Sequence, residues 1–123
     1  MENNVQNQEA YPGDLPQHQL HWIHSVEQYL AEHLADSQLT IPILAKTFSL
    51  SERQFHRRIK TITLMTPNLL IRKMRMEKAK QLLSTGACTT VAETAKAVGY
   101  NQADYFSRLY QRWHGRRPSD HLP

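Results

Sequence analysis

The feature that most constrains the fold of this 123-residue chain is an internal repeat. Ala45 matches Ala95 after 50 positions, and the stretch that follows matches after 51 positions. The pairs at the second spacing are Phe55 and Phe106, Arg57 and Arg108, Ile59 and Tyr110, Ile62 and Trp113, and Pro67 and Pro118. A constant period indicates duplicated supersecondary units. The change of spacing predicts a one-residue insertion near the start of the last helix in the second copy.

The first copy has the pattern of two short helices joined by a tight turn. Thr40 before Ile41-Pro42 is typical of a cap followed by a first-turn proline, and Ser51 with Gln54 fits a capping box. The apolar residues at helical spacing are Ile41, Leu44, Ala45 and Phe48 in one helix and Phe55, Ile59 and Ile62 in the other. This is the plan of a helix-turn-helix, whose second helix can enter a DNA major groove.

The second copy repeats these signals. Thr90 and Glu93 form a capping box, Gly99 can end the first helix in the left-handed conformation, and Asn101 with Asp104 predicts the next cap. The inward residues are expected to be Val91, Ala92, Ala95 and Val98, followed by Phe106, Leu109, Tyr110 and Trp113. Gly115 and Pro118 then close the unit.

A long helix is predicted between the two copies. Residues 67–84 contain no internal Gly or Pro, and Thr66-Pro67 supplies a start. The core-facing positions are expected to be Leu70, Met74, Ala79, Leu82 and Leu83. At 1.5 Å per residue the helix is roughly 27 Å long, and with half a helix width at each end it approaches the ~34 Å of one DNA turn. Such a helix could set the spacing of two DNA-contacting units.

We therefore predict an all-α fold of about seven helices, with helix-turn-helix subdomains at about 39–62 and 90–114 joined by a linker helix at 67–84. A further helix at 21–35 carries one apolar stripe formed by Ile23, Val26, Leu30 and Leu34. Residues 1–19 are rich in Asn, Gln, Glu and Pro, which predicts a disordered tail or linker before a folded domain at 20–123.

The charge distribution predicts a polyanionic partner. All 15 Lys and Arg residues lie between Lys46 and Arg117, so residues 1–45 carry −6 and residues 46–123 carry +10. A basic surface of this density attracts nucleic acid, although charge alone would equally fit a solvated surface without a partner. The spacing of the basic residues on the predicted helices has to decide between a nucleic-acid partner and a solvated surface.

Several other classes of protein are disfavoured. Cys88 is the sole cysteine, which excludes an internal disulfide or a multi-thiolate zinc site and fits a cytoplasmic location. No apolar run approaches the roughly 20 residues that span a bilayer, so we expect a soluble chain with no membrane partner. The best evidence for an enzyme is His18, His21 and His24, two of which could meet a metal ion. Without further ligands we expect solvated histidines, no metal, no cofactor and no catalytic activity.

The residues at 39–122 resemble the DNA-binding domain of the AraC/XylS family of bacterial transcription regulators. The most specific segments are Ala95-Lys96-Ala97-Val98-Gly99-Tyr100, Tyr105-Phe106-Ser107-Arg108, Gly115 with Pro118, and Arg75-Met76-Glu77-Lys78-Ala79-Lys80-Gln81-Leu82-Leu83. Two positions depart from the family pattern. Leu64 stands where a glycine usually follows the recognition helix, the second helix of the first helix-turn-helix. Asp120-His121-Leu122 replaces the Tyr-Arg ending of the family, which predicts a frayed last helix.

The resemblance implies which residues contact DNA. Because the core takes Phe55, Ile59 and Ile62, the first recognition helix turns its polar residues outward. The family's base-contacting positions fall on Arg53, His56 and Arg57 in the first helix, and on Asp104, Ser107 and Arg108, with Ala103 nearby, in the second. The expected contacts to the DNA backbone are Lys46, Arg58, Lys60 and Arg112. Asp104 has two possible roles, as a cap partner of Asn101 or as an acceptor for cytosine N4.

These observations predict sequence-specific binding of double-stranded DNA and regulation of transcription. The alternative is a helical protein-interaction module whose basic long helix binds an acidic partner. Contact with RNA polymerase is compatible with either, and no small-molecule ligand is expected within the chain. The family's usual sensor or receiver domain is absent, so the chain is either a small regulator or the carboxyl-terminal domain of a larger one. The linker-like composition before the first helix favours the second.

Overall fold

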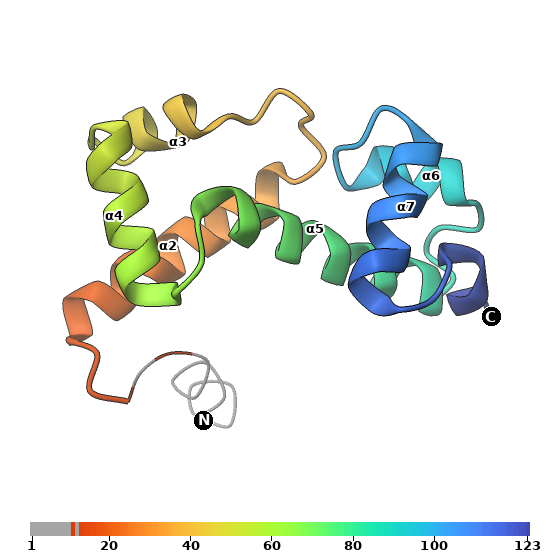
Figure 1. The fold of residues 1–123 in the computed structure, drawn as a ribbon, viewed down its shortest axis with the longest axis horizontal. Helices are drawn as coiled ribbons and strands as arrows, with labels where there is room; N and C mark the ends of the chain where they lie inside the picture. The colour runs from red at the N-terminus through yellow and green to blue at the C-terminus, as the bar shows by residue number, and fades with distance from the viewer. Residues whose placement is uncertain (1–10, 12) are drawn as a thin grey trace. The chain divides into compact units, whose positions relative to one another are not determined.

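The computed structural model describes Tyr11 and residues 13–123, and within them every regular element is a helix. The elements are α2 (Gln17–His33), α3 (Ile41–Thr47), α4 (Glu52–Thr63), α5 (Pro67–Ser84), α6 (Val91–Ala97), α7 (Ala103–His114) and the 3-10 helix η1 (Pro118–His121) (Figure 1). The all-α prediction and the bounds of the long helix are confirmed. In the described part of the chain, no helix combines the length and apolar character that crossing a bilayer requires.

The chain divides into two compact units, which are described separately. The first contains the residues up to Tyr29 together with Thr40–Leu70, and the second contains Leu30–Leu39 together with Ile71–Pro123. Each unit therefore holds one predicted helix-turn-helix.

The caps of the first unit form largely as the sequence predicts. Thr40 is the N-cap of α3, although its side chain makes no capping hydrogen bond. At α4 the capping box is complete, because Ser51 Oγ accepts from the Gln54 N–H at 3.1 Å and Gln54 Oε1 accepts from the Ser51 N–H at 3.0 Å. Two of the N–H groups that a helix start leaves unpaired are thereby satisfied.

The first core is built from one face of each helix. The buried residues are Leu20, Ile23 and Val26 of α2, Leu44 and Ala45 of α3, and Phe55, Ile59 and Ile62 of α4. Aromatic rings extend this core, since the ring of Phe48 lies 6.1 Å from Trp22, 5.9 Å from Tyr29 and 6.3 Å from Phe55. Edge-on and offset aromatic pairs of this kind stabilise a core beyond their buried area.

The first described helix begins earlier than the apolar stripe predicts. Helix α2 starts at Gln17, four residues before His21. Ahead of it, the Tyr11 hydroxyl donates to the Glu27 carboxylate, and the Tyr11 ring lies 6.3 Å from that of His24. Residues 1–10 and 12, which make up most of the predicted tail, lie outside the described residues.

The helix starts of the second unit differ in detail from the prediction. Thr90 caps α6 by accepting from the Glu93 N–H at 3.1 Å, but Glu93 Oε1 accepts from Thr89, one residue before the cap, at 2.9 Å. The predicted cap at Asn101 is wrong: Gln102 is the N-cap of α7 and makes no side-chain bond. The inserted residue moves the helix start, so Asp104 lies in the first turn, where a carboxylate interacts favourably with the helix dipole.

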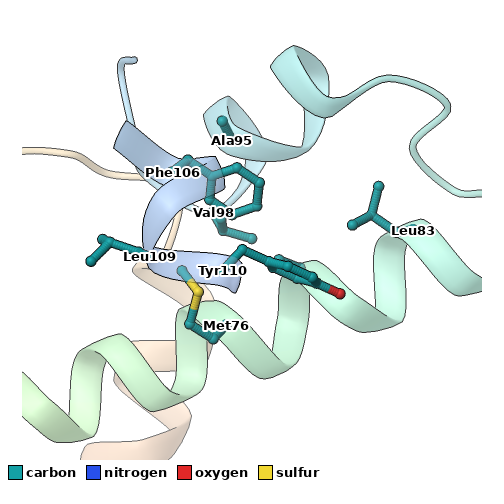
Figure 2. Packing of buried hydrophobic residues seen from close by; sticks show 8 residues of the cluster. Met76, Leu83, Ala95, Val98, Phe106, Leu109 and Tyr110 are labelled. Carbon is teal, nitrogen blue, oxygen red and sulfur yellow. The ribbon is translucent and has the colours of Figure 1, made fainter. Parts of the chain in front are cut away.

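The second core joins α5, α6 and α7 (Figure 2). Its buried members are Met76, Ala79, Leu83, Ala95, Val98, Phe106, Leu109 and Tyr110. Leu82 and Val91 are partly buried and pack against this core, as expected. Three inward predictions are wrong. Met74 is only half-buried and lies beside the face formed by Met76, Ala79 and Leu83, whereas Ala92, in the first turn of α6, is exposed. Trp113 is 36% exposed because it lies in the last turn of α7.

The predicted repeat is confirmed at the level of whole helices. Helix α6 follows α3 by 50 residues at both ends, and α7 follows α4 by 51, so the extra residue falls between α6 and α7. The backbone repeats as well. Ser49 (φ 58°) and Leu64 (φ 63°) take the left-handed conformation at the positions that Gly99 (φ 93°) and Gly115 (φ 74°) occupy in the second unit.

Leu64→Gly should raise the free energy of unfolding by about 1 kcal/mol. The left-handed conformation costs a non-glycine residue roughly 1–2 kcal/mol, and part of this gain is offset because glycine loses more conformational entropy on folding. The Leu64 side chain is 75% exposed, so its removal loses little apolar burial. Urea denaturation measures the change. Leu64→Ala is the control, since it removes the same side chain and keeps the strain; an equal gain for both variants would rule out backbone strain as the cause.

Candidate nucleic-acid interface

The outward face of α4 brings together three of the predicted DNA-contacting residues. Phe55 and Ile59 point into the core, so Arg53, Arg57 and Lys60, three or four residues apart, share the opposite, exposed face. His56 is also exposed, at the side of this face. The planar Arg57 guanidinium can donate two parallel bonds to guanine O6 and N7.

Arg58 is directed to the flank of α4. Its guanidinium carbon lies 5.0 Å from the centre of the Trp22 ring on α2. A neighbouring surface pocket of about 260 Å³ is lined by Gln19, Gln54, Arg57, Arg58, Thr61 and Ile62. Two guanidinium groups beside hydroxyl and amide donors suit an anionic oxygen, so Arg58 is better placed for a phosphate than for a base edge.

The outward face of α7 carries Asp104 and Arg108, both exposed, at positions equivalent to Arg53 and Arg57. Ala103 and Ser107 are half-buried at the side of this face. The Arg108 guanidinium carbon lies 6.0 Å from the centre of the Tyr105 ring. Sequence reasoning missed Tyr105, although the spacing of three residues on a helix places the two side chains side by side.

The remaining basic residues are spread over several elements. Lys46 in the last turn of α3 and Arg112 on α7 are exposed and free of the cores. Arg117 pairs with Asp120 at 3.4 Å, and because both side chains are accessible to solvent, the pair adds little stability. The Arg117 backbone N–H, followed by its guanidinium, holds the pKa of Asp120 below its usual value.

The turn before α7 is fixed by close contacts within the second unit. A Cβ at Gly99 would lie 2.2 Å from the Leu34 carbonyl oxygen and 2.8 Å from Arg75 Nη2. Arg75 Nη2 donates to the Asp36 carbonyl at 3.0 Å, and its guanidinium carbon lies 5.4 Å from the centre of the Tyr100 ring. The turn that positions α7 therefore packs directly against backbone that follows α2.

The carboxyl-terminal η1 is formed and held against α7, which corrects the prediction of a frayed end. Tyr110 and His121 share a hydrogen bond between the hydroxyl and Nδ1, and the His114 ring lies 4.4 Å from that of Tyr110. Burial raises the pKa of Tyr110 to about 12. Burial, followed by the charge of Lys80, lowers the pKa of His121, so neutral His121 is the favoured form.

The three histidines that were considered as metal ligands lie on α2. His18 and His21 are exposed, whereas His24 is half-buried beside Tyr11. In Tyr11 and residues 13–123, no three His, Cys, Asp or Glu side chains are grouped so that they could hold a metal ion. Cys88 is buried in the loop before α6.

Comparison with known proteins agrees with this geometry. Residues 44–122 match the family model described as a helix-turn-helix domain. The structure is similar to that of a probable AraC family transcriptional regulator from Rhodopseudomonas palustris, with 28% identity and a TM-score of 0.67 over 79% of this chain and 90% of that one. The chain belongs to the AraC/XylS family. The resemblance carried by the motifs around Gly99 and Arg108 is thereby confirmed.

Two further relatives of this AraC/XylS domain show how much of each chain is similar. The HTH-type transcriptional activator RhaS of Escherichia coli (strain SE11) is 33% identical over 92 residues, which cover 75% of this chain and 32% of that protein. The DNA-binding domain of AdpA, a global transcriptional factor solved in complex with a target DNA, is 26% identical with a TM-score of 0.73, over 80% of this chain and 86% of that one. The chain thus spans about a third of the length of RhaS.

Proposed function

We propose that this AraC/XylS domain binds double-stranded DNA at specific sequences and thereby regulates transcription. Helices α4 and α7 would each enter a major groove, with Arg57 and Arg108 as the main base contacts. His56, Ser107 and the other residues of the two outward faces would complete recognition, and Lys46, Arg58, Lys60 and Arg112 would contact phosphates.

One observation carries the proposal: both units expose an arginine at the same position of the helix that follows the turn. Arg57 and Arg108 are exposed, while Phe55 and Phe106, two residues earlier and on the opposite face of each helix, are buried. Duplicated cores alone would not require the same cation on both outward faces. A helix that presents arginine opposite its buried face is suited to reading guanine in the major groove.

The relatives support the same assignment. AdpA was solved with a target DNA, and RhaS is a transcriptional activator. Because this chain spans about a third of the length of RhaS, any sensing of a signal falls outside the proposal. Contact with RNA polymerase and a cytoplasmic location stay predictions, as does the division into a tail at 1–19 and a domain at 20–123.

The test is selection of bound sequences from a library of random duplexes. The expected product is a bipartite site, and if α4 and α7 enter successive major grooves, its two halves should lie about 10 bp apart from centre to centre. The control is the double variant Arg57→Ala/Arg108→Ala, which should retain weak binding through its other basic residues but enrich no sequence.

A lack of enrichment by the unchanged protein would exclude sequence-specific recognition. If the protein also fails to shift a random duplex at low salt, the basic surface does not serve DNA binding at all. That result would favour the protein-interaction module with an acidic partner.

A further inference from the structure

The arginine at the centre of the α7 face is supported by an aromatic ring. Arg108 and Tyr105 lie three residues apart on α7, and the Arg108 guanidinium carbon is 6.0 Å from the centre of the Tyr105 ring. Tyr105 is 43% exposed, so its ring borders the surface on which Arg108 would meet DNA. A guanidinium stacked on an aromatic face samples fewer orientations than one in open solvent.

The ring of Tyr105 is itself held in place. Its centre lies 6.1 Å from that of Tyr100, with an interplanar angle of 62°. Tyr100 in turn contacts Phe106 of the core, at 5.7 Å between ring centres, and Arg75, whose guanidinium carbon is 5.4 Å from the Tyr100 ring centre. These contacts all lie within the second unit, so the support reaches from its core to Arg108.

The first unit lacks this arrangement at the equivalent position. Gln54 replaces Tyr105, and its side-chain oxygen accepts from the Ser51 N–H in the capping box. The guanidinium that stacks on an aromatic ring in that unit belongs to Arg58, over Trp22, and not to Arg57. The support of Arg108 is therefore not a by-product of the repeat.

We propose that Tyr105 is a positioning residue, which holds the Arg108 guanidinium in the orientation that contacts a base. The inference rests on the proposed function, since it assigns Tyr105 a role in DNA recognition by α7. An arginine that makes two bonds to a guanine loses side-chain freedom when it binds. Tyr105 limits this loss before DNA arrives, so its contribution appears in the preference for the cognate site.

The test uses the site selected by the unchanged protein and a random duplex of equal length. Tyr105→Leu should lower the ratio of cognate to random affinity about two- to fivefold, the effect of one cation–π contact at an exposed position. Tyr105→Phe should retain the ratio, because the ring that Arg108 contacts is preserved. In the Arg108→Ala background, Tyr105→Leu should cause no further loss of the ratio. A thermal melt of each variant shows whether the fold is retained.

The outcomes separate this inference from the proposed function. If the unchanged protein selects a site and Tyr105→Leu keeps its ratio, Tyr105 does not position Arg108, while sequence-specific binding stands. If the losses from Tyr105→Leu and Arg108→Ala add, Tyr105 acts on DNA independently of Arg108, and the inference is overturned. If the unchanged protein selects no site, both proposals fail together.

Discussion

Gly99→Ala should destabilise the second unit by about 2–5 kcal/mol, the sum of left-handed backbone strain and overpacking. Gly99 has φ 93°, and an added Cβ would lie 2.2 Å from the Leu34 carbonyl oxygen. The contacted atom belongs to backbone, which cannot move aside as the end of a side chain can. The turn before α7 would have to shift, and Arg75, 2.8 Å from the same point, would be displaced with it.

Gly115→Ala is the matched control. Gly115 also has a left-handed backbone, at φ 74°, but nothing lies within 4 Å of its added Cβ, so only the strain of roughly 1–2 kcal/mol applies. The chain has two tryptophans, and Trp113 reports on the second unit alone in a Trp22→Phe background. Urea denaturation followed by Trp113 fluorescence should separate the two variants. Equal losses would mean that the contact with Leu34 is not what requires glycine.

The parts of the fold that the sequence could predict are those set by neighbouring residues, above all the helix starts. Helices α4, α5 and α6 begin where Ser51, Thr66 and Thr90 predict, since a cap and its partner lie within one turn of chain. The start of α7 was missed because Asn101 offers the same local pattern while the structure uses Gln102, which makes no side-chain bond. The sequence predicted glycine at position 99 from the left-handed conformation that ends the helix, and not from the close contact with Leu34.

Contacts between distant segments could not be predicted in this way. The approach of Leu34 to Gly99, and the bond from Arg75 to the Asp36 carbonyl, join residues far apart in sequence. Periodicity placed Met74 instead of the fully buried Met76 on the inward face of α5, and it did not show that the inward face of α7 leaves the core at Trp113. Met74 and Trp113 were therefore predicted to be more buried than they are.

In the candidate site, too, features set by neighbouring residues could be predicted, whereas contacts between distant segments could not. Elimination of the buried residues predicted the outward face of α4, because a helix has only one side left once its core face is known. The resemblance to the family gave the equivalent positions on α7. The orientation of each cation on that face depends on its neighbours in space. Arg58 lies over Trp22 of another helix, which the repeat does not encode, whereas the pairing of Arg108 with Tyr105 was accessible from their spacing.

Arg57→Ala should lower affinity for the selected site by about 5- to 150-fold and lower affinity for a random duplex far less. The expected loss corresponds to one bidentate contact between arginine and guanine, roughly 1–3 kcal/mol. Arg57 is exposed on the face of α4 opposite Phe55 and Ile59, so its removal leaves the core intact. Competition gel shifts with both duplexes at one fixed salt concentration measure the two affinities.

Lys60→Ala is the matched comparison, because Lys60 is exposed on the same face of α4, three residues from Arg57. A lysine that contacts a phosphate contributes equally to every sequence, so its loss should weaken both duplexes alike and reduce the salt dependence of binding by about one released counterion. On one helix face, Arg57→Ala thus tests the preference for the selected sequence, and Lys60→Ala tests the affinity for DNA of any sequence. Equal losses on both duplexes with Arg57→Ala would show that Arg57 contacts the DNA backbone, and the base contact would then have to come from Arg53 or His56.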